Sequence, residues 1–202
     1  MSNLNIDRNE VLRYLGYGQQ HLGEQLDCLI DECIAEAKLL SDLRKTYRFF
    51  ALTRDEKELC LANSTLVLAG QDISHHLAQA QSCVVMALTL GASIDQRIRY
   101  YEKVNLTKAL ILDVCASAAI EAAANMLCNQ INTELRTKAQ QLTSRFSPGY
   151  GDLSLETQKE VISVLGADRA IGINVTANYI LVPRKSITAI AGVVDQTLAK
   201  PA

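Results

Sequence analysis

Tryptophan is absent from the 202-residue sequence, and phenylalanine and tyrosine together account for only 5% of it. Proline occurs three times, and charge of one sign is not in excess, because 20 basic and 22 acidic residues leave a net charge of −2. A chain without a basic stripe lacks the electrostatic attraction that nucleic-acid binding or an anionic membrane surface requires. We therefore expect neither nucleic acid nor a membrane as a partner.

Long apolar runs and metal-binding cysteine patterns are also missing. No stretch approaches the roughly 18 uninterrupted apolar residues of a membrane span, and the first ten residues lack the cationic and apolar regions of a secretory signal. None of the six cysteines forms a C-x-x-C pair or a zinc-type Cys/His cluster. We expect a cytoplasmic protein without a metal site, whose cysteines are reduced core residues: Cys28, Cys33, Cys60, Cys83, Cys115 and Cys128.

The remaining composition is that of a globular protein, with 49% apolar residues and enough length for one stable core. Apolar spacing of three and four, capping patterns at Asp7 and at Ser93 with Gln96, and a stretch rich in alanine and leucine without proline or glycine predict helices. The predicted helices cover residues 7–15, 21–43, 71–80, 93–103, 105–141 and 154–165. Runs of β-forming residues predict strands at 46–53, 64–69 and 83–90, and a hairpin over 172–194 whose two strands are separated by a break at residues 183–185. Regular strand–helix alternation is missing, so we predict an α+β fold with a mixed or antiparallel sheet and one domain over residues 1–202.

Three polar residues share one side of the long alanine-rich helix predicted over 105–141. Asp113, Ser117 and Glu121 recur every fourth residue and therefore point the same way. Carboxylates on a buried face are costly unless they meet cations, donors or a ligand. Two interpretations remain open: this side faces solvent or lies near the helix start, or Glu121 binds a ribose hydroxyl or an amine of a ligand.

The segment SRFSPGYGDLS at 144–154 is the one concentrated glycine and proline loop in the sequence. Gly149 and Gly151 permit close approach of the backbone, and Tyr150 between them supplies an amphipathic ring. Such a loop suits a flat group held by main-chain hydrogen bonds, while Arg145 faces a carboxylate. A structural turn with a capping arginine is the alternative. No G-x-S-x-G elbow or helix-opening G-x-G-x-x-G is present, so neither a serine hydrolase nor a Rossmann cofactor is supported.

Five segments carry a resemblance to a known family. They are IDRNEVLRYLGY at 6–17, ISHHLAQAQSCVVMALTLGASID at 73–95, LDVCASAAIEAAANML at 112–127, RFSPGYGD at 145–152 and IGINVTANYILVPRKSITAIAGV at 171–193. Together they resemble the activation domain of cobalamin-dependent methionine synthase, in the free-standing form that some bacteria carry. The resemblance spans nearly the whole chain.

The resemblance implies that the chain binds S-adenosylmethionine and supports reductive methylation of a partner's cob(II)alamin. The loop residues Arg145, Ser147, Pro148, Gly149 and Tyr150 would bind S-adenosylmethionine, and Tyr150 would also face the corrinoid in a catalytic position. Glu121 would bind a polar part of the ligand. Asp7 resembles the family's amino-terminal ligand contact, although it also has the sequence context of a helix N-cap.

The implied partners are a corrinoid-binding methionine synthase without its own activation domain and a flavodoxin-like or ferredoxin-like electron donor. The sequence departs from the fused family form because KAQQLTSR before the loop lacks that form's additional glutamate, which puts contact with the ligand ammonium in doubt. It also lacks a cobalt-ligating D-x-H-x-x-G motif, so the cobalamin must belong to the partner. The alternative is a non-catalytic S-adenosylmethionine-sensing or docking subunit for another corrinoid methyltransferase.

Overall fold

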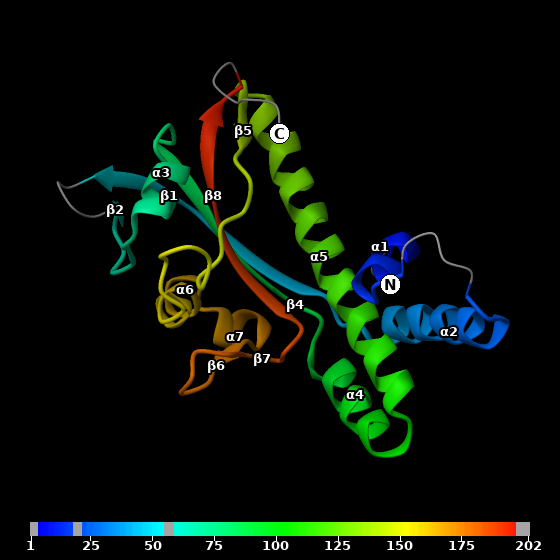
Figure 1. Cartoon of the computed structure of the whole chain (residues 1–202). Coiled ribbons are helices and arrows are strands. Elements are labelled where there is room, and N and C mark those ends of the chain that lie inside the picture. Colours follow the sequence, from blue (N-terminus) through cyan, green and yellow to red (C-terminus); the bar gives the residue numbers. More distant parts are fainter. Residues whose placement is uncertain (1–3, 18–21, 55–58, 197–202) are drawn as a thin grey trace.

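The computed structural model describes residues 4–17, 22–54 and 59–196, which are built around a six-stranded sheet (Figure 1). Its strand order is β3-β2-β1-β4-β8-β5, and every pair of neighbours is antiparallel. The strands are β1 (Arg44–Arg54), β2 (Leu59–Leu61), β3 (Val67–Leu68), β4 (Ser82–Thr89), β5 (Gln140–Leu142) and β8 (Ser186–Asp195). Of the two predicted arrangements, mixed or antiparallel, the described sheet has the antiparallel one.

The central strand β4 is buried on both faces, which explains its uninterrupted apolar sequence. Val84, Met86 and Leu88 belong to one hydrophobic cluster, whereas Cys83 and Val85 belong to the other. Successive side chains of a strand point to opposite faces, so a strand covered on both faces must be apolar at every position.

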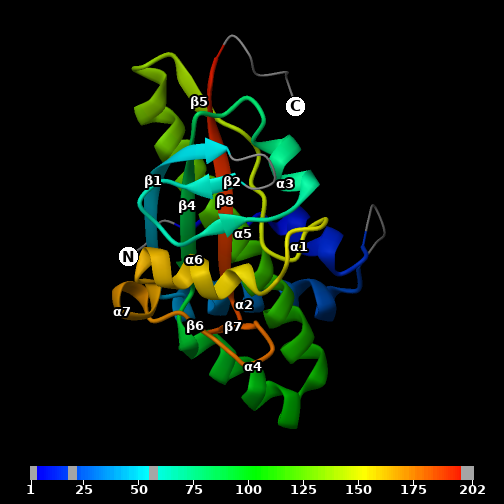
Figure 2. The same cartoon turned by 90° about the vertical axis from the view of Figure 1, so that its left-hand side faces the viewer.

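Helices cover both faces of the sheet (Figures 1 and 2). One side carries α1 (Arg8–Tyr14), α2 (Glu24–Leu40), α4 (Ala92–Val104) and α5 (Leu106–Arg136). The other side carries α3 (Gln71–His76), α6 (Thr157–Leu165), α7 (Ala167–Ile171) and the small hairpin of β6 (Asn174–Val175) and β7 (Leu181–Val182). The result is a single α+β domain with the predicted long helix.

Helix α5 has the length and apolar composition of a membrane span, and 56% of its most apolar stretch is buried inside the domain. Buried alanines such as Ala116, Ala119 and Ala123 place it against the sheet and its neighbouring helices. In this structure α5 is therefore a core helix.

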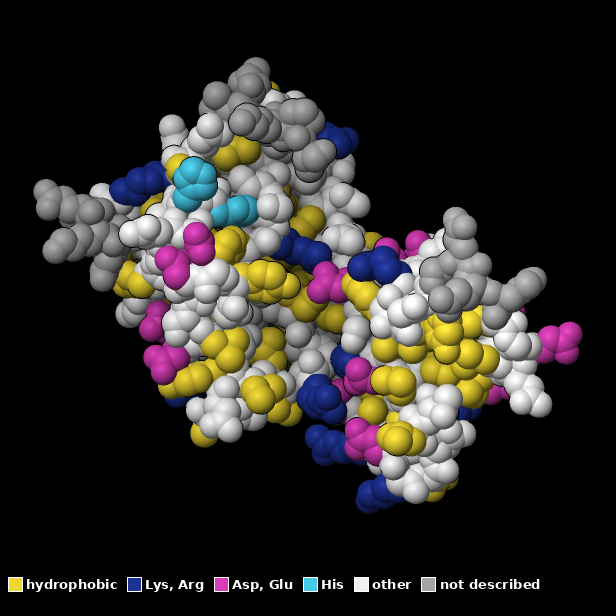
Figure 3. Space-filling view, in the orientation of Figure 1, with side chains coloured by type: hydrophobic (Ala, Val, Ile, Leu, Met, Phe, Trp, Pro, Cys, Tyr) yellow, Lys and Arg dark blue, Asp and Glu magenta, His cyan; other side chains and the backbone are white. Residues whose placement is uncertain are grey.

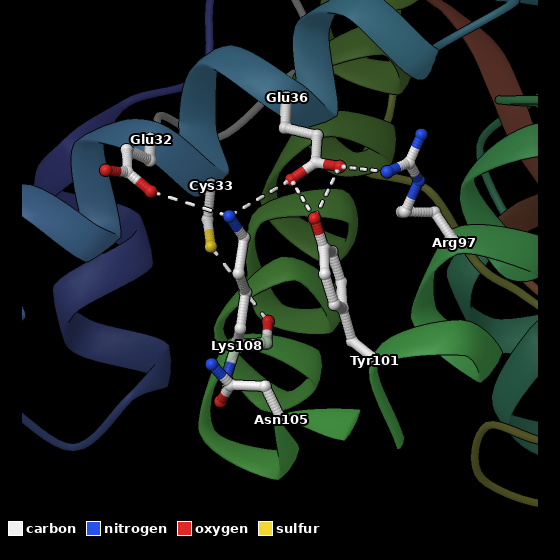
Figure 4. A network of polar contacts seen from close by, with 7 residues as sticks. All are labelled: Glu32, Cys33, Glu36, Arg97, Tyr101, Asn105 and Lys108. Atoms are coloured by element: carbon white, nitrogen blue, oxygen red, sulfur yellow. Dashed lines mark hydrogen bonds and ion pairs between the residues drawn. The ribbon is translucent and has the colours of Figure 1, made fainter. Parts of the chain in front are cut away.

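A polar network joins α5 to α2 and α4 (Figure 4). The Tyr101 hydroxyl lies 3.1 Å from both carboxylate oxygens of Glu36, which also pairs with Arg97 at 3.3 Å and with Lys108 at 3.7 Å. Lys108 further contacts Glu32 at 3.4 Å. Each charged group at this junction has a partner of opposite sign, so the network fixes the three helices relative to one another.

The predicted end of the long helix was wrong by several residues. Helix α5 ends at Arg136, Ala139 adopts a φ of +55°, and residues 140–142 form β5 instead. Asn132 Oδ1 accepts the Leu142 N–H at 2.7 Å, and β5 pairs with β8. Tertiary pairing here overrides the helical propensity of the sequence.

A C-terminal hairpin is present, as predicted, but it is smaller than the range 172–194. It consists of β6 and β7 joined by a turn in which Tyr179 has a φ of +61°. The run at 186–194, predicted as the second arm, lies in β8 between β4 and β5. Its apolar sequence suits this central place, since residues 188–194 are all buried.

Shorter elements account for the other differences. The sequence did not indicate β2 or α7, and α4 begins after Gly91 without a side-chain cap, although a Ser93 capping box was predicted. Residue 21, the predicted start of the second helix, lies outside the described residues, and the helix begins at Glu24.

The cysteines divide by burial. Cys33, Cys83 and Cys115 are buried as predicted, whereas Cys28 is exposed and Cys60 and Cys128 are partly buried. Burial raises the pKa of the Cys83 and Cys115 thiols from 9.0 to about 12, and that of Cys33 to about 11.

We expect labelling by a thiol reagent near about pH 8 to modify Cys28 rapidly and to spare Cys33, Cys83 and Cys115 until the protein opens. The pKa of the Cys83 thiol is 9.0 in the unfolded chain and about 12 in the folded protein, so folding favours the neutral thiol. Its contribution to the free energy of unfolding is therefore complete below pH 9.0 and is lost as the pH rises toward about 12. Mass spectrometry of the labelled protein checks the order, with guanidinium-unfolded protein as control. Labelling of Cys83 as fast as that of Cys28 would contradict the packing of β4.

Replacement of Leu88 by alanine should destabilise the domain by about 2–5 kcal/mol, because it leaves a cavity where β4 meets the helices. Leu39→Ala is the matched control, since Leu39 is 83% exposed and its truncation should change the stability by less than about 0.5 kcal/mol. Urea unfolding measures both. Equal effects would argue against the burial of β4.

Candidate functional site

The loop over residues 143–153 is fixed at its start by the sheet and by α3. Phe146 and Ile190 of β8 exchange two backbone hydrogen bonds of 2.8 Å. His76 Nε2 lies 2.8 Å from the Ser144 carbonyl oxygen, and its ring packs 5.3 Å from that of Phe146. The loop therefore leaves the sheet edge in a defined direction.

A reciprocal pair of aspartates fixes the end of the same loop. The Asp152 carboxylate accepts the N–H groups of Gln71 (2.6 Å) and Asp72 (3.2 Å) at the start of α3, and Asp72 accepts the Asp152 N–H at 3.2 Å. Gly151 has a φ of +51°, and a Cβ there would lie 2.3 Å from Asp72 Oδ2. Glycine at this position is what lets the loop approach α3 so closely.

Between these anchors, residues 147–150 form the tip of the loop. The Tyr150 N–H donates to the Ser147 carbonyl oxygen at 3.1 Å, and the Gly149 N–H donates to that of Leu153 at 2.9 Å. Pro148 is buried, whereas Tyr150 is 69% exposed with one ring edge against Phe146. The predicted ordered turn is thus present, and it presents an aromatic ring at the surface.

The polar side of α5 meets two cations. Glu121 pairs with Arg145 of the loop at 2.8 Å, and Asp113 pairs with Lys185 at 2.9 Å. Ser117 Oγ accepts from Lys185 Nζ at 2.9 Å. Asp113, Ser117 and Glu121 are all partly buried, so they do not form a solvent-facing side of the helix. They do not lie at the helix start either, because α5 begins at Leu106.

Lys185 was not among the expected site residues. It lies in the VPRKSITAI segment just before β8, where the sequence indicated only a break between strands. Its side chain is 10% exposed and already neutralised by Asp113. The two carboxylates on an apolar helix were the signal that a second cation was required, but their spacing does not say which cation supplies it.

Arg145 has a buried donor without a partner. Its Nη2 bonds Glu121, while its Nη1 is buried and makes no hydrogen bond. Leaving a buried guanidinium donor unsatisfied is costly, so the arrangement fits an additional acceptor such as a ligand carboxylate or carbonyl. The residues present therefore suit a ligand with an anionic or carbonyl oxygen.

Asp7 acts as a helix cap. Its Oδ1 accepts the Asn9 N–H at 2.8 Å at the start of α1. Helix α1 packs on α5, but within the described part of the chain no hydrogen bond or ion pair joins Asp7 to Arg145 or Glu121. The structure thus brings together the loop and Glu121, and the one hydrogen bond that it gives the Asp7 side chain among the described residues is the cap of α1.

We define the α5 groove by Asp113, Ser117, Glu121, Arg145 and Lys185. The space-filling view shows basic and acidic side chains side by side in a hollow between the half of the molecule with α3, α6 and β6–β7 and the half with α1, α2, α4 and α5 (Figure 3). Opposite charges line the hollow in alternation, which suits a ligand that carries both signs.

Two other hollows lack comparable chemistry. One of about 460 Å³ lies between α6, α7 and β6, and one of about 420 Å³ lies beside the end of α5. Neither is lined by a buried polar atom without a partner, and no expected site residue borders them. Within the described ranges, no three His, Cys, Asp or Glu side chains are placed to hold a metal ion.

Comparison with known proteins identifies the fold. No family model and no curated protein matches the sequence. Among solved structures, the crystal structure of the MetH reactivation domain bound to AdoHcy (S-adenosylhomocysteine) aligns with a TM-score of 0.72 over 98% of this chain and 76% of that one. The chain has the fold of the MetH reactivation domain. Sequence identity to that domain is 15%, so the likeness establishes the architecture and leaves the ligand to be argued from the groove.

The attachment of the loop to α3 predicts different costs for two glycine substitutions. Gly151→Ala must displace the Asp72 carboxylate, whereas Gly166→Ala, at a similar φ of +58°, meets nothing within 4 Å. Both share the strain of a left-handed alanine, so Gly151→Ala should lower the free energy of unfolding by about 1 kcal/mol more, the cost of a lost hydrogen bond. Urea unfolding of the two variants measures the difference. Equal costs would mean that the aspartate pair does not hold the loop.

Proposed function

We propose that this chain is a reactivation protein that binds S-adenosylmethionine in the α5 groove and supports reductive methylation of cob(II)alamin held by a partner methionine synthase. The observation that carries the proposal is the buried, unpartnered Nη1 of Arg145. It lies on the loop that resembles the family's ligand loop, in a fold shared with a domain whose crystal structure contains AdoHcy.

The Glu121–Arg145 ion pair is the binding element for the amino-acid end of the ligand. A zwitterion carries a carboxylate for Arg145 and an ammonium for Glu121, so it can enter the pair without leaving either charge unmatched. Glu121 is 46% exposed and has room to turn toward an incoming group, whereas Arg145 is 21% exposed and more enclosed. In this role Glu121 substitutes for the glutamate that the segment before the loop lacks.

The tip of the loop receives the adenine end. The Ser147 N–H is the main-chain donor for the adenine and the carbonyl oxygens of Pro148 and Gly149 are the acceptors, because the Gly149 N–H and the Ser147 carbonyl oxygen are already bonded within the loop. The aspartate pair holds these groups at fixed positions before the ligand arrives. The exposed Tyr150 ring faces the partner's corrinoid. Asp7 remains a predicted contact whose observed role is to cap α1.

The bound sulfonium supplies an electrophilic methyl group, and the protein supplies its orientation. Arg145, Glu121 and the loop hold the ligand, while the partner contributes the cobalamin and a flavodoxin-like or ferredoxin-like protein contributes the electron. The proposed partner is a cytoplasmic methionine synthase that lacks its own activation domain.

Calorimetric titration tests the binding. We expect saturable binding of S-adenosylmethionine and S-adenosylhomocysteine but not of ATP, and we expect Arg145→Ala to weaken binding by about 1.5–3 kcal/mol, the value of a charge-assisted hydrogen bond. Arg13→Ala is the control, because it removes an exposed arginine–glutamate pair on α1 and should leave affinity unchanged. Undiminished affinity in a folded Arg145→Ala protein would remove the loop from the site.

A reactivation assay separates the proposal from a non-catalytic sensor or docking subunit. The chain is mixed with cob(II)alamin-loaded methionine synthase lacking an activation domain, S-adenosylmethionine and a reduced flavodoxin. Formation of methylcobalamin, followed by absorbance, supports reactivation. Ligand binding without methylation supports the sensor.

A further inference from the structure

We infer that Lys185 is a specificity-determining residue of the α5 groove, because its ammonium offsets the Asp113 carboxylate that would otherwise favour S-adenosylmethionine over S-adenosylhomocysteine. The inference rests on the proposed function for the identity of the two ligands. It concerns a residue outside the loop and outside the Glu121–Arg145 pair.

Hydrogen bonds of three consecutive residues, 184–186, fix the backbone around Lys185. The Arg184 N–H donates to Asp95 Oδ2 at 2.6 Å, and the Lys185 carbonyl oxygen accepts the Leu90 N–H at 2.9 Å. Ser186 Oγ donates to Thr89 Oγ1 at 2.9 Å. These contacts fix the start of β8 against the end of β4 and the first turn of α4, so the lysine side chain leaves a rigid base.

The direction of that side chain brings a second cation into the groove. Lys185 Nζ contacts Ser117 and Asp113, and Ser117 lies one helical turn before Glu121, which is about 6 Å along the axis of α5. Two methylene groups separate the α-carbon of either ligand from its sulfur. The sulfur of a ligand whose α-carbon is held at Glu121 and Arg145 therefore stays within about 10 Å of Lys185 whichever way the ligand runs, which is close to the screening length at physiological salt.

The two ligands differ at that sulfur by one methyl group and one positive charge. A unit charge about 10 Å away in a partly buried site, where salt screens it incompletely, changes the relative affinity of a cation and a neutral analogue by about 3- to 10-fold. In the native groove Asp113 offsets Lys185, and the two side chains are 32% and 10% exposed. Removing either partner therefore leaves a net charge, and the sign of that charge depends on which partner is removed.

Two single substitutions test this opposition. Lys185→Met leaves Asp113 without its cation. The ratio of the dissociation constant for S-adenosylmethionine to that for S-adenosylhomocysteine should therefore fall about 3- to 10-fold, in favour of S-adenosylmethionine. Asp113→Asn leaves Lys185 unbalanced and should shift the ratio about as far toward S-adenosylhomocysteine. Lys185→Arg keeps the charge and should keep the native ratio. Both shifts should shrink as salt is added.

The ratio separates an electrostatic role from a structural one, because a general loosening of the groove weakens both ligands together. Shifts of the same sign in both variants, or ratios within about twofold of the native value, would overturn the inference. If Lys185→Met does not fold, the direction of the shift in Asp113→Asn decides. Failure of the native protein to bind either ligand would instead reject the proposed function.

Discussion

The structure depends on how the apolar helix α5 accommodates its carboxylates. Asp113 and Glu121 bound a stretch of α5 in which every residue is buried or partly buried, and each of the two carboxylates is paired with a cation. The two cations come from segments next to β8. Arg145 lies on the loop that pairs with Ile190 of β8, and Lys185 directly precedes the first residue of β8. The same two ion pairs therefore attach the helix to the sheet and create a groove lined by alternating charges.

The rigid scaffold around the groove holds its charged groups in place for a ligand. The loop is bound to β8 at Phe146 and to α3 at Asp152, and the sheet beneath is packed on both faces. These contacts fix the backbone that carries Arg145, and its side chain would have to break the Glu121 ion pair to turn its remaining donor to solvent. An unsatisfied donor on a rigid frame is prepared for a ligand, since little conformational entropy is lost on binding.

Much of this architecture follows from local patterns in the sequence. The amphipathic helices, the apolar run of β4 and the Asp7 cap are local features, and the structure has each of them. The end of α5 and the pairing of β8 depend on partners far along the chain, which residue spacing does not specify. The site divides in the same way. The Arg145 loop was visible as a glycine and proline motif, whereas Lys185 became part of the groove only through the fold.

The most direct test of the central claim is a crystal structure of the chain with S-adenosylhomocysteine. The result expected is a ligand in the α5 groove whose carboxylate is bound by Arg145 Nη1, with Glu121 moved to the ligand ammonium. A ligand bound elsewhere, such as the hollow between α6 and α7, with the 2.8 Å Glu121–Arg145 pair intact, would contradict the claim.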